Sequence, residues 1–233
     1  MEAQRFISKL IGESKINEDT KILDFSAPER FEFEAGQYVR MAFYKEGKRI
    51  LRDYSIFSAP YEKGKISVYF KKVKDGYASN FLFDMKVGEK IEMKGPLGDF
   101  VVGDFSKDLI FVSSGTGFGP FMSIIKDLIY KGYRRKMILI RGYRKEESLV
   151  CENELKKIKK NNKNFFYHNI LSQPNEEDYN LKGHVQEFLE GFIPYDFNGD
   201  FYICGLKDMV SDICEKLREI GVSDERIFFE RYD

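Results

Sequence analysis

The first 103 residues alternate short apolar runs with clusters of turn residues. The runs are rich in Val, Ile, Phe and Tyr, residues that favour strands, and signals such as Glu46-Gly47 and Lys74-Asp75-Gly76 separate them. This rhythm predicts an antiparallel barrel or sandwich. The predicted strands cover residues 37–44, 50–58, 65–73 and 90–95.

The rhythm changes after Asp104, where apolar runs alternate with amphipathic stretches of helical period. Such alternation predicts a parallel sheet with crossover helices, and the segment 101–108 is the expected hinge between two domains. The predicted strands are 109–114, 137–143, 164–171, 200–204 and 226–230, and the predicted helices are 118–131, 150–160, 184–190 and 207–220.

Composition narrows the class of protein. Lys plus Arg and Asp plus Glu both total 38, so no global charge attracts nucleic acid. No stretch has the length of a signal-peptide core or of a membrane span, so we expect a soluble, cytoplasmic chain. The three cysteines are too scattered for a disulfide framework, a zinc site or an iron-sulfur cluster, so we expect reduced thiols, no bound metal, and any iron-sulfur centre on another chain.

A glycine turn connects the predicted strand 109–114 to the helix that follows it. Gly115 and Gly117 carry no side chains, so a pyrophosphate can approach the backbone, and the helix N-terminus supplies N–H groups and a partial positive charge. Pro120 is compatible with a helix start. The turn lacks the usual G-x-G-x-x-G pattern and the P-loop lysine, so by itself it is equally consistent with an ordinary tight turn.

A second cluster of polar chemistry lies on the predicted strand 50–58. Arg52, Tyr54 and Ser55 offer a cation, an aromatic face and a hydroxyl, which suit a phosphate, a flat ring and a ring nitrogen. Strand alternation alone also explains Tyr54 and Ser55, with Tyr54 in the core and Ser55 outside, and Arg52 is alternatively a charge on the barrel surface.

The order of the motifs resembles the ferredoxin-NADP reductase superfamily, in the form without an iron-sulfur domain, over nearly the whole chain. The resemblance implies an N-terminal antiparallel β-barrel that binds flavin, residues 1–103, and a C-terminal Rossmann-like domain with a parallel sheet that binds NAD(P), residues 104–233. The matching segments are RDYS at Arg52, GYAS at Gly76, GTGFGP at Gly115, CGLKDM at Cys204 and the ending FFERYD with Glu230 and Tyr232.

The resemblance also assigns a flavin site. Arg52 would pair with a flavin phosphate, Tyr54 would lie against one face of the ring, and Ser55 would bond near N5. Tyr232 would cover the second face, although the extra residue Asp233 follows it. Ser79 is alternatively a simple helix N-cap. The remaining expected flavin contacts are Phe70, Lys71, Lys72, Gly76, Tyr77 and Ala78.

For the nicotinamide nucleotide the resemblance implies contacts from the ends of several predicted strands. By the resemblance, Cys204 would adjoin the nicotinamide and Glu230 would help organise it, so together with Ser55 they are the expected catalytic residues. Outside this family, a buried Cys and a near-terminal Glu are ordinary structural residues. The expected nucleotide contacts are Gly115, Thr116, Gly117, Pro120, Arg144, Ser172, Cys204 and Gly205.

The implied function is hydride transfer between NAD(P)H and bound FAD, with electrons passed to a separate ferredoxin, flavodoxin or oxygenase component. FAD is favoured over FMN by the pair of flavin motifs. Cations after the second strand, Arg141, Arg144 and Lys145, suit NADPH, whereas Gln173 lacks the charge that a 2'-phosphate needs, so NADH is slightly favoured. An NAD(P)H:flavin reductase and an electron-input subunit of a larger complex are the alternatives.

Overall fold

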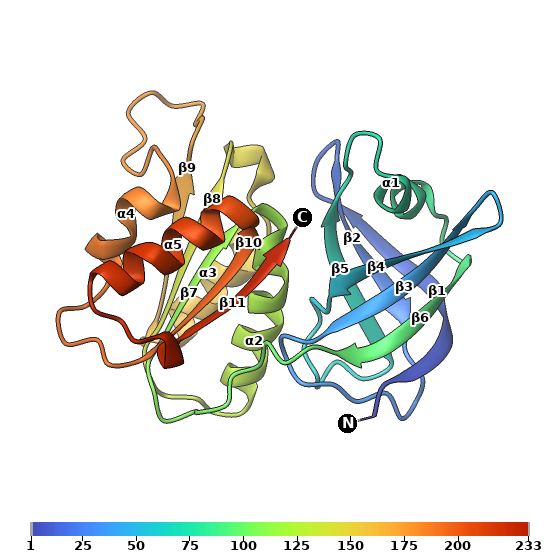
Figure 1. Cartoon of the computed structure of the whole chain (residues 1–233), viewed down its shortest axis with the longest axis horizontal. Helices are drawn as coiled ribbons and strands as arrows, with labels where there is room; N and C mark the ends of the chain where they lie inside the picture. Colours follow the sequence, from blue (N-terminus) through green and yellow to red (C-terminus); the bar gives the residue numbers. More distant parts are fainter. Residues whose placement is uncertain (1, 233) are drawn as a thin grey trace. The chain divides into compact units, whose positions relative to one another are not determined.

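The computed structural model describes residues 2–232 of the 233-residue chain. Its contacts divide the chain into two compact units (Figure 1). The first contains the residues up to Val102 together with Gly119–Lys131, and the second contains Gly103–Phe118 and the residues from Gly132 onward. Among the described residues no helix has the length and apolar character needed to cross a membrane.

The first unit is a curled six-stranded antiparallel sheet with the strand order β4-β3-β6-β1-β2-β5 (Figure 1). The strands at the two ends of this order are β4 and β5. An antiparallel bridge between Ile56, the residue that follows β4, and Val68 on β5 connects them and closes the sheet. The expectation of an antiparallel β-barrel is therefore confirmed. The elements are β1 (Gln4–Lys15), β2 (Thr20–Ser26), β3 (Tyr38–Lys45), β4 (Lys48–Ser55), β5 (Lys65–Lys71), α1 (Tyr77–Asp84) and β6 (Lys90–Leu97).

Two of these strands, β1 and β2, are absent from the strands predicted by sequence. Their apolar side chains are spaced among charged ones, as at Leu10 and Leu23, which are both fully buried. β1 is central because it pairs with both β6 and β2. The barrel core thus depends on β1, although the apolar positions of this strand were too widely interrupted to predict it from the sequence.

The second unit is a parallel five-stranded sheet in the order β11-β10-β7-β8-β9, which confirms the Rossmann-like expectation. On one face, α4 and α5 bury Leu189, Val210 and Ile213 against strand residues such as Val112 and Ile203. The elements are β7 (Leu109–Ser114), β8 (Met137–Tyr143), α3 (Glu152–Asn161), β9 (Phe165–Leu171), α4 (Val185–Phe192), β10 (Asp200–Leu206), α5 (Lys207–Glu219) and β11 (Ile227–Tyr232), with short 3-10 turns at Gly115–Gly117, Glu146–Ser148 and Asp224–Arg226.

Helix α2 (Phe118–Tyr130) follows β7 in the chain, but nearly all of it is grouped with the barrel. The rings of Phe121 and Phe100 are 5.8 Å apart, and Tyr130 stacks on Tyr61 with centroids 4.5 Å apart. Periodicity predicts this helix and its length, but it cannot show which unit the helix packs against. The expected boundary near Gly103 stays a prediction.

Candidate functional site

The segment Arg52–Ser55 ends strand β4, at one edge of the six-stranded order. Arg52 is exposed, while Tyr54 and Ser55 are half-buried. The Arg52 guanidinium donates to the carbonyl oxygen of Leu51 at 2.8 Å, and no carboxylate within residues 2–232 forms an ion pair with it. The guanidinium therefore keeps donors available for an anion such as a phosphate.

The two neighbours of Arg52 in the motif have fixed partners. Asp53 accepts two hydrogen bonds from Arg40 on β3, at 2.7 and 2.8 Å. The Tyr54 ring packs edge-on against Phe43 and Phe70, at centroid distances of 6.4 and 6.2 Å. Burial raises the pKa of the Tyr54 hydroxyl, so this side chain stays neutral at physiological pH. Tyr54 thus packs against the barrel core, and it lies in the same segment as the predicted flavin contacts Arg52 and Ser55.

The segment Gly76–Ser79 forms the start of α1. Gly76, and not Ser79, is the N-cap, so the alternative interpretation of Ser79 as a simple N-cap is wrong. The Ser79 hydroxyl accepts from the Val73 N–H at 3.0 Å and donates to the Gly76 carbonyl at 3.1 Å. A Cβ on Gly76 would lie 2.9 Å from both Ser79 Oγ and Val73 Cβ, so only glycine fits there without a shift. Ser79 thereby fixes the loop that presents the first N–H groups of α1.

Phe70, Lys71 and Lys72 end strand β5 and begin the following loop. Phe70 is buried, Lys71 forms an ion pair with Asp19 at 2.9 Å, and the Lys72 ammonium lies 5.0 Å from the ring centre of Phe83. These side chains are engaged inside the barrel unit. A cofactor contact from this stretch would therefore come from its backbone.

In the second unit the glycine turn packs tightly against the end of β10. A Cβ added to Gly117 would overlap the backbone of Cys204 and Gly205, whereas Gly115 has open space around it and a φ of +52°. The Ser114 hydroxyl accepts from the Leu206 N–H at 3.2 Å. Two segments far apart in sequence are therefore in direct contact, which brings together five of the predicted nucleotide residues: Gly115, Thr116, Gly117, Cys204 and Gly205.

Cys204 lies on β10 between Ser113 of β7 and Glu230 of β11. Its thiol is fully buried and has a side-chain hydrogen bond with Tyr232. Burial, and secondly the nearby Glu230 carboxylate, raise the pKa of the thiol well above its ordinary value. Cys204 is therefore a small, neutral, buried side chain on β10, and it is not a thiolate nucleophile. The predicted effect of Asp233 concerns a position outside the described residues.

Ser113 is a residue that the sequence interpretation missed. It is fully buried, and its hydroxyl is one of the buried polar atoms without a hydrogen-bond partner among the described residues. Nothing in the sequence distinguishes it from Ser114 beside it. Only the register of β7 and β10, which places Ser113 opposite Cys204, connects it with the site.

Arg144 and Ser172 follow adjacent strands and lie near one another. The Ser172 N–H donates to the Tyr143 carbonyl at 3.0 Å, and the Gln173 N–H donates to the Arg144 carbonyl at 2.8 Å. Arg144 is exposed, so it can meet a nucleotide. Pro120 lies in the first turn of α2, after the glycine turn.

Arg141 does not belong with these exposed cations. It is fully buried within β8 and donates to Asn169 Oδ1 at 2.9 Å, to the Val150 carbonyl at 2.6 Å and to Glu152. Its expected part in binding a 2'-phosphate is therefore wrong, because the residue lies inside the strand rather than after it and the guanidinium is bonded within the fold.

Comparisons with known proteins agree with this two-part arrangement. Residues 8–102 match the family model of the oxidoreductase FAD-binding domain, and residues 111–215 match that of the oxidoreductase NAD-binding domain. The electron transfer component of toluate 1,2-dioxygenase from Pseudomonas putida is 29% identical over 204 residues, which cover 86% of this chain and 59% of that protein. One subunit of the Na(+)-translocating NADH-quinone reductase from Klebsiella pneumoniae is 28% identical over 90% of this chain and 56% of its own length.

The chain thus spans somewhat less than 60% of these two curated relatives. A solved structure of similar size is a ferredoxin NADP+ reductase from Neisseria gonorrhoeae with bound FAD and NADP. It shares the fold with a TM-score of 0.87 at 22% identity, over 99% of both chains. The chain thus joins an oxidoreductase FAD-binding domain to an oxidoreductase NAD-binding domain, in a fold shared with the ferredoxin NADP+ reductase.

Proposed function

We propose that this chain is an NAD(P)H-dependent flavoprotein reductase, which takes hydride from a reduced nicotinamide nucleotide and passes electrons through bound FAD to a separate acceptor. The observation that carries the proposal is the packing of the glycine turn against Cys204-Gly205, with Glu230 on the next strand. Open parallel sheets bind nucleotides at the carboxyl ends of their strands, and β7, β10 and β11 all end there. The family match of the preceding unit to an FAD-binding domain supplies the second half of the reaction.

The residues of the barrel unit suit the role of holding the flavin. Arg52 offers a phosphate a cation that has no carboxylate partner within residues 2–232, and the start of α1 at Gly76–Ser79 offers N–H groups to a pyrophosphate. The half-buried Ser55 hydroxyl is proposed to orient the ring. When bound, the flavin supplies the chemistry of accepting hydride and releasing single electrons.

The residues of the second unit suit the nicotinamide nucleotide. Gly115 leaves room for a pyrophosphate, and Thr116 stands beside it in the turn. The neutral Cys204 thiol excludes water from the strand end without adding charge, and the Glu230 carboxylate on the neighbouring strand is proposed to orient the carboxamide. These residues bind and orient; none needs to act as a nucleophile.

The acceptor is proposed to be an iron-sulfur protein or an oxygenase component, because the dioxygenase relative is named as an electron transfer component. Ferredoxin and flavodoxin are the specific candidates. Among the basic residues of the barrel, Arg49, Lys63, Lys65 and Lys71 pair with carboxylates in the structure, so these four offer less free charge to an acidic partner. An electron-input component of a larger complex is the second candidate, supported by the match to a subunit of the Na(+)-translocating quinone reductase.

Anaerobic titration of the purified, FAD-loaded chain with NADH and, separately, with NADPH tests the proposal. We expect the flavin absorbance to bleach with at least one nucleotide, and to recover when an oxidised ferredoxin or flavodoxin is added. A chain that holds no flavin, or whose flavin stays oxidised with both nucleotides, would contradict the central claim. Recovery only with free flavin would favour the flavin-reductase alternative.

Substitution of the two candidate residues at the hydride end separates binding from transfer. We expect Cys204→Ala and Glu230→Ala to slow flavin reduction by on the order of tenfold or more, because the donor ring loses its alignment. The flavin content should stay that of the unmodified chain, since both residues lie outside the unit that holds the flavin. Loss of flavin from either variant would place these residues in the wrong site.

A further inference from the structure

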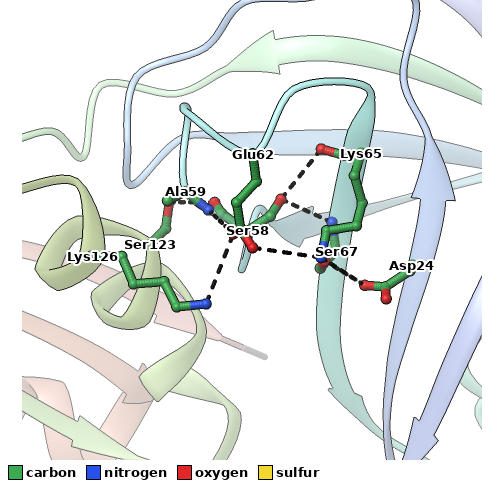
Figure 2. Close-up of polar contacts among 8 residues, drawn as sticks. All are labelled: Asp24, Ser58, Ala59, Glu62, Lys65, Ser67, Ser123 and Lys126. Carbon is green, nitrogen blue, oxygen red and sulfur yellow. Dashed lines mark hydrogen bonds and ion pairs between the residues drawn. The ribbon is translucent and has the colours of Figure 1, made fainter. Parts of the chain in front are cut away.

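A polar network with three buried serines at its centre connects helix α2 to the segment that directly follows Ser55 (Figure 2). All of its members lie in the barrel unit. The hydroxyl of Ser123, which is fully buried in α2, donates to the carbonyl oxygen of Ser58 at 2.7 Å. Ser58 is only three residues beyond Ser55, the residue proposed to orient the flavin ring.

The Ser58 side chain carries the network into the barrel wall. Its hydroxyl accepts from the backbone N–H of Ser67 on β5 at 3.0 Å, and the Ser67 hydroxyl bonds Asp24 Oδ1 on β2 at 2.5 Å (Figure 2). The backbone between Ser55 and Ser58 is held as well, because Ile56 and Phe57 donate to the carbonyls of Gln37 and Ser67 at 2.9 and 2.8 Å. The segment 56–58 is therefore bonded on both sides, with Ser123 as its contact to α2.

A charged pair reinforces the same junction. The Glu62 carboxylate accepts from the Ala59 N–H at 2.7 Å and lies 3.8 Å from the Lys126 ammonium of α2 and 3.6 Å from that of Lys65. Only 14% of the Lys126 side chain is exposed, and its ammonium lies 5.9 Å from the ring centre of Phe57. Low exposure strengthens the Coulombic attraction between the two charges compared with a surface pair, and their desolvation offsets part of that gain.

Helix α2 is continuous with the glycine turn, since Phe118 follows Gly117 directly. Within the barrel unit, Ser123 of this helix contacts Ser58, which lies three residues beyond the proposed flavin contact Ser55. Buried polar groups that are fully bonded fix one backbone position, because any displacement leaves an unsatisfied group.

We propose that Ser123, Glu62 and Lys126 are positioning residues for the reaction: they hold the 56–59 segment, and through it Ser55, in the place that hydride transfer requires. This inference rests on the proposed function. It assigns to α2 a role beyond presenting the glycine turn, because the helix also fixes the strand end that meets the flavin.

Ser123→Ala tests the hydroxyl. We expect the maximal rate of flavin reduction by NADH or NADPH in anaerobic stopped-flow measurements to fall by on the order of tenfold, with flavin content and nucleotide affinity nearly unchanged. Hydrogen exchange at the Ile56, Phe57 and Ser67 amides should be about fivefold to tenfold faster, the ratio that one net hydrogen bond gives. Ser211→Ala is the matched control, since Ser211 also donates to a backbone carbonyl from a helix but only within α5, to Lys207 at 3.0 Å.

Glu62 offers a second test that does not disturb the buried core. Glu62→Gln keeps an acceptor for the Ala59 N–H and removes the charge, whereas Glu62→Ala removes both. We expect Glu62→Ala to slow reduction and speed amide exchange at residues 56–59, and Glu62→Gln, which loses the charge opposite Lys126, to recover only part of the rate.

The outcomes separate the two claims of function and positioning. If the unmodified chain is not reduced by either nucleotide, the proposed function fails. If it is reduced and Ser123→Ala and Glu62→Ala transfer hydride at its rate, the positioning role is overturned. A loss confined to thermal stability or flavin retention, equal in both Glu62 variants, would likewise overturn it.

Discussion

Arg52 and Arg40 lie on neighbouring strands of the same barrel, but only Arg40 has a carboxylate partner within residues 2–232. Arg40 and Asp53 satisfy each other in an exposed pair, and such pairs contribute roughly 0–1 kcal/mol to stability. Arg52 contacts only a backbone carbonyl among its polar partners in the same range. Within the sequence RDYS, the acidic residue therefore serves the sheet, and the cation remains available for a ligand.

Arg52→Ala should weaken FAD binding while changing the free energy of unfolding little, because Arg52 is exposed. A hydrogen bond to a charged group contributes about 1.5–3 kcal/mol, which corresponds to an affinity loss of about 10- to 150-fold. Quenching of FAD fluorescence on binding measures it. Arg40→Ala is the matched control, because it removes another exposed arginine one strand away and should change the affinity by less than about fivefold. Equal losses in both variants would contradict the assignment.

At the scale of elements, the glycine turn and the end of β10 form one tightly packed unit. Gly117 has no space for a side chain because the backbone of Cys204 and Gly205 fills it, whereas nothing among the described residues lies within 4 Å of a Cβ on Gly119. This close contact fixes the backbone of the turn against the end of β10. The glycine at 117 is thus required by packing, independently of its proposed part in nucleotide binding.

Gly117→Ala should destabilise the chain by about 1–3 kcal/mol, the usual cost of overpacking a closed site, and should weaken nucleotide binding at the same time. Gly119→Ala is the matched control in the same segment. It should be neutral or slightly stabilising, since alanine is the better helix former and the space is open. Chemical denaturation and titration with NADH or NADPH measure the two effects, and a fully stable Gly117→Ala variant would contradict the packing argument.

At the scale of the whole molecule, cofactor binding should couple to stability. A ligand that binds only the folded state stabilises it, by about 2.7 kcal/mol at a concentration one hundred times its Kd. We expect added FAD to raise the midpoint of thermal unfolding of the flavin-free chain. FMN should raise it less, because FMN lacks the second phosphate that the start of α1 is proposed to bind. Equal shifts with FAD and FMN would contradict the assignment of Gly76–Ser79 to a pyrophosphate.

The class of the two units and the positions of most elements follow from local patterns in the amino-acid sequence. Strand β7 and strand β8 coincide with their predicted ranges, because continuous apolar runs bounded by turn residues have few alternatives. The same local patterns located the RDYS and glycine-turn segments, whose chemistry depends on neighbouring residues. Strands β1 and β2 were not predicted, because charged residues interrupt their apolar positions. These apolar residues become buried only when the two strands pair within the barrel.

Which of these segments meet depends instead on contacts between residues far apart in the chain. Arg141 looks in sequence like another cation near a strand end, yet the fold buries it among Asn169, Glu152 and the Val150 carbonyl, where no phosphate can reach it. Ser113 and Ser123 are ordinary serines until strand register and helix packing give them Cys204 and Ser58 as neighbours. The physical reason is that periodicity records which face of an element is buried, whereas the partner on that face is set by contacts between residues far apart in the chain.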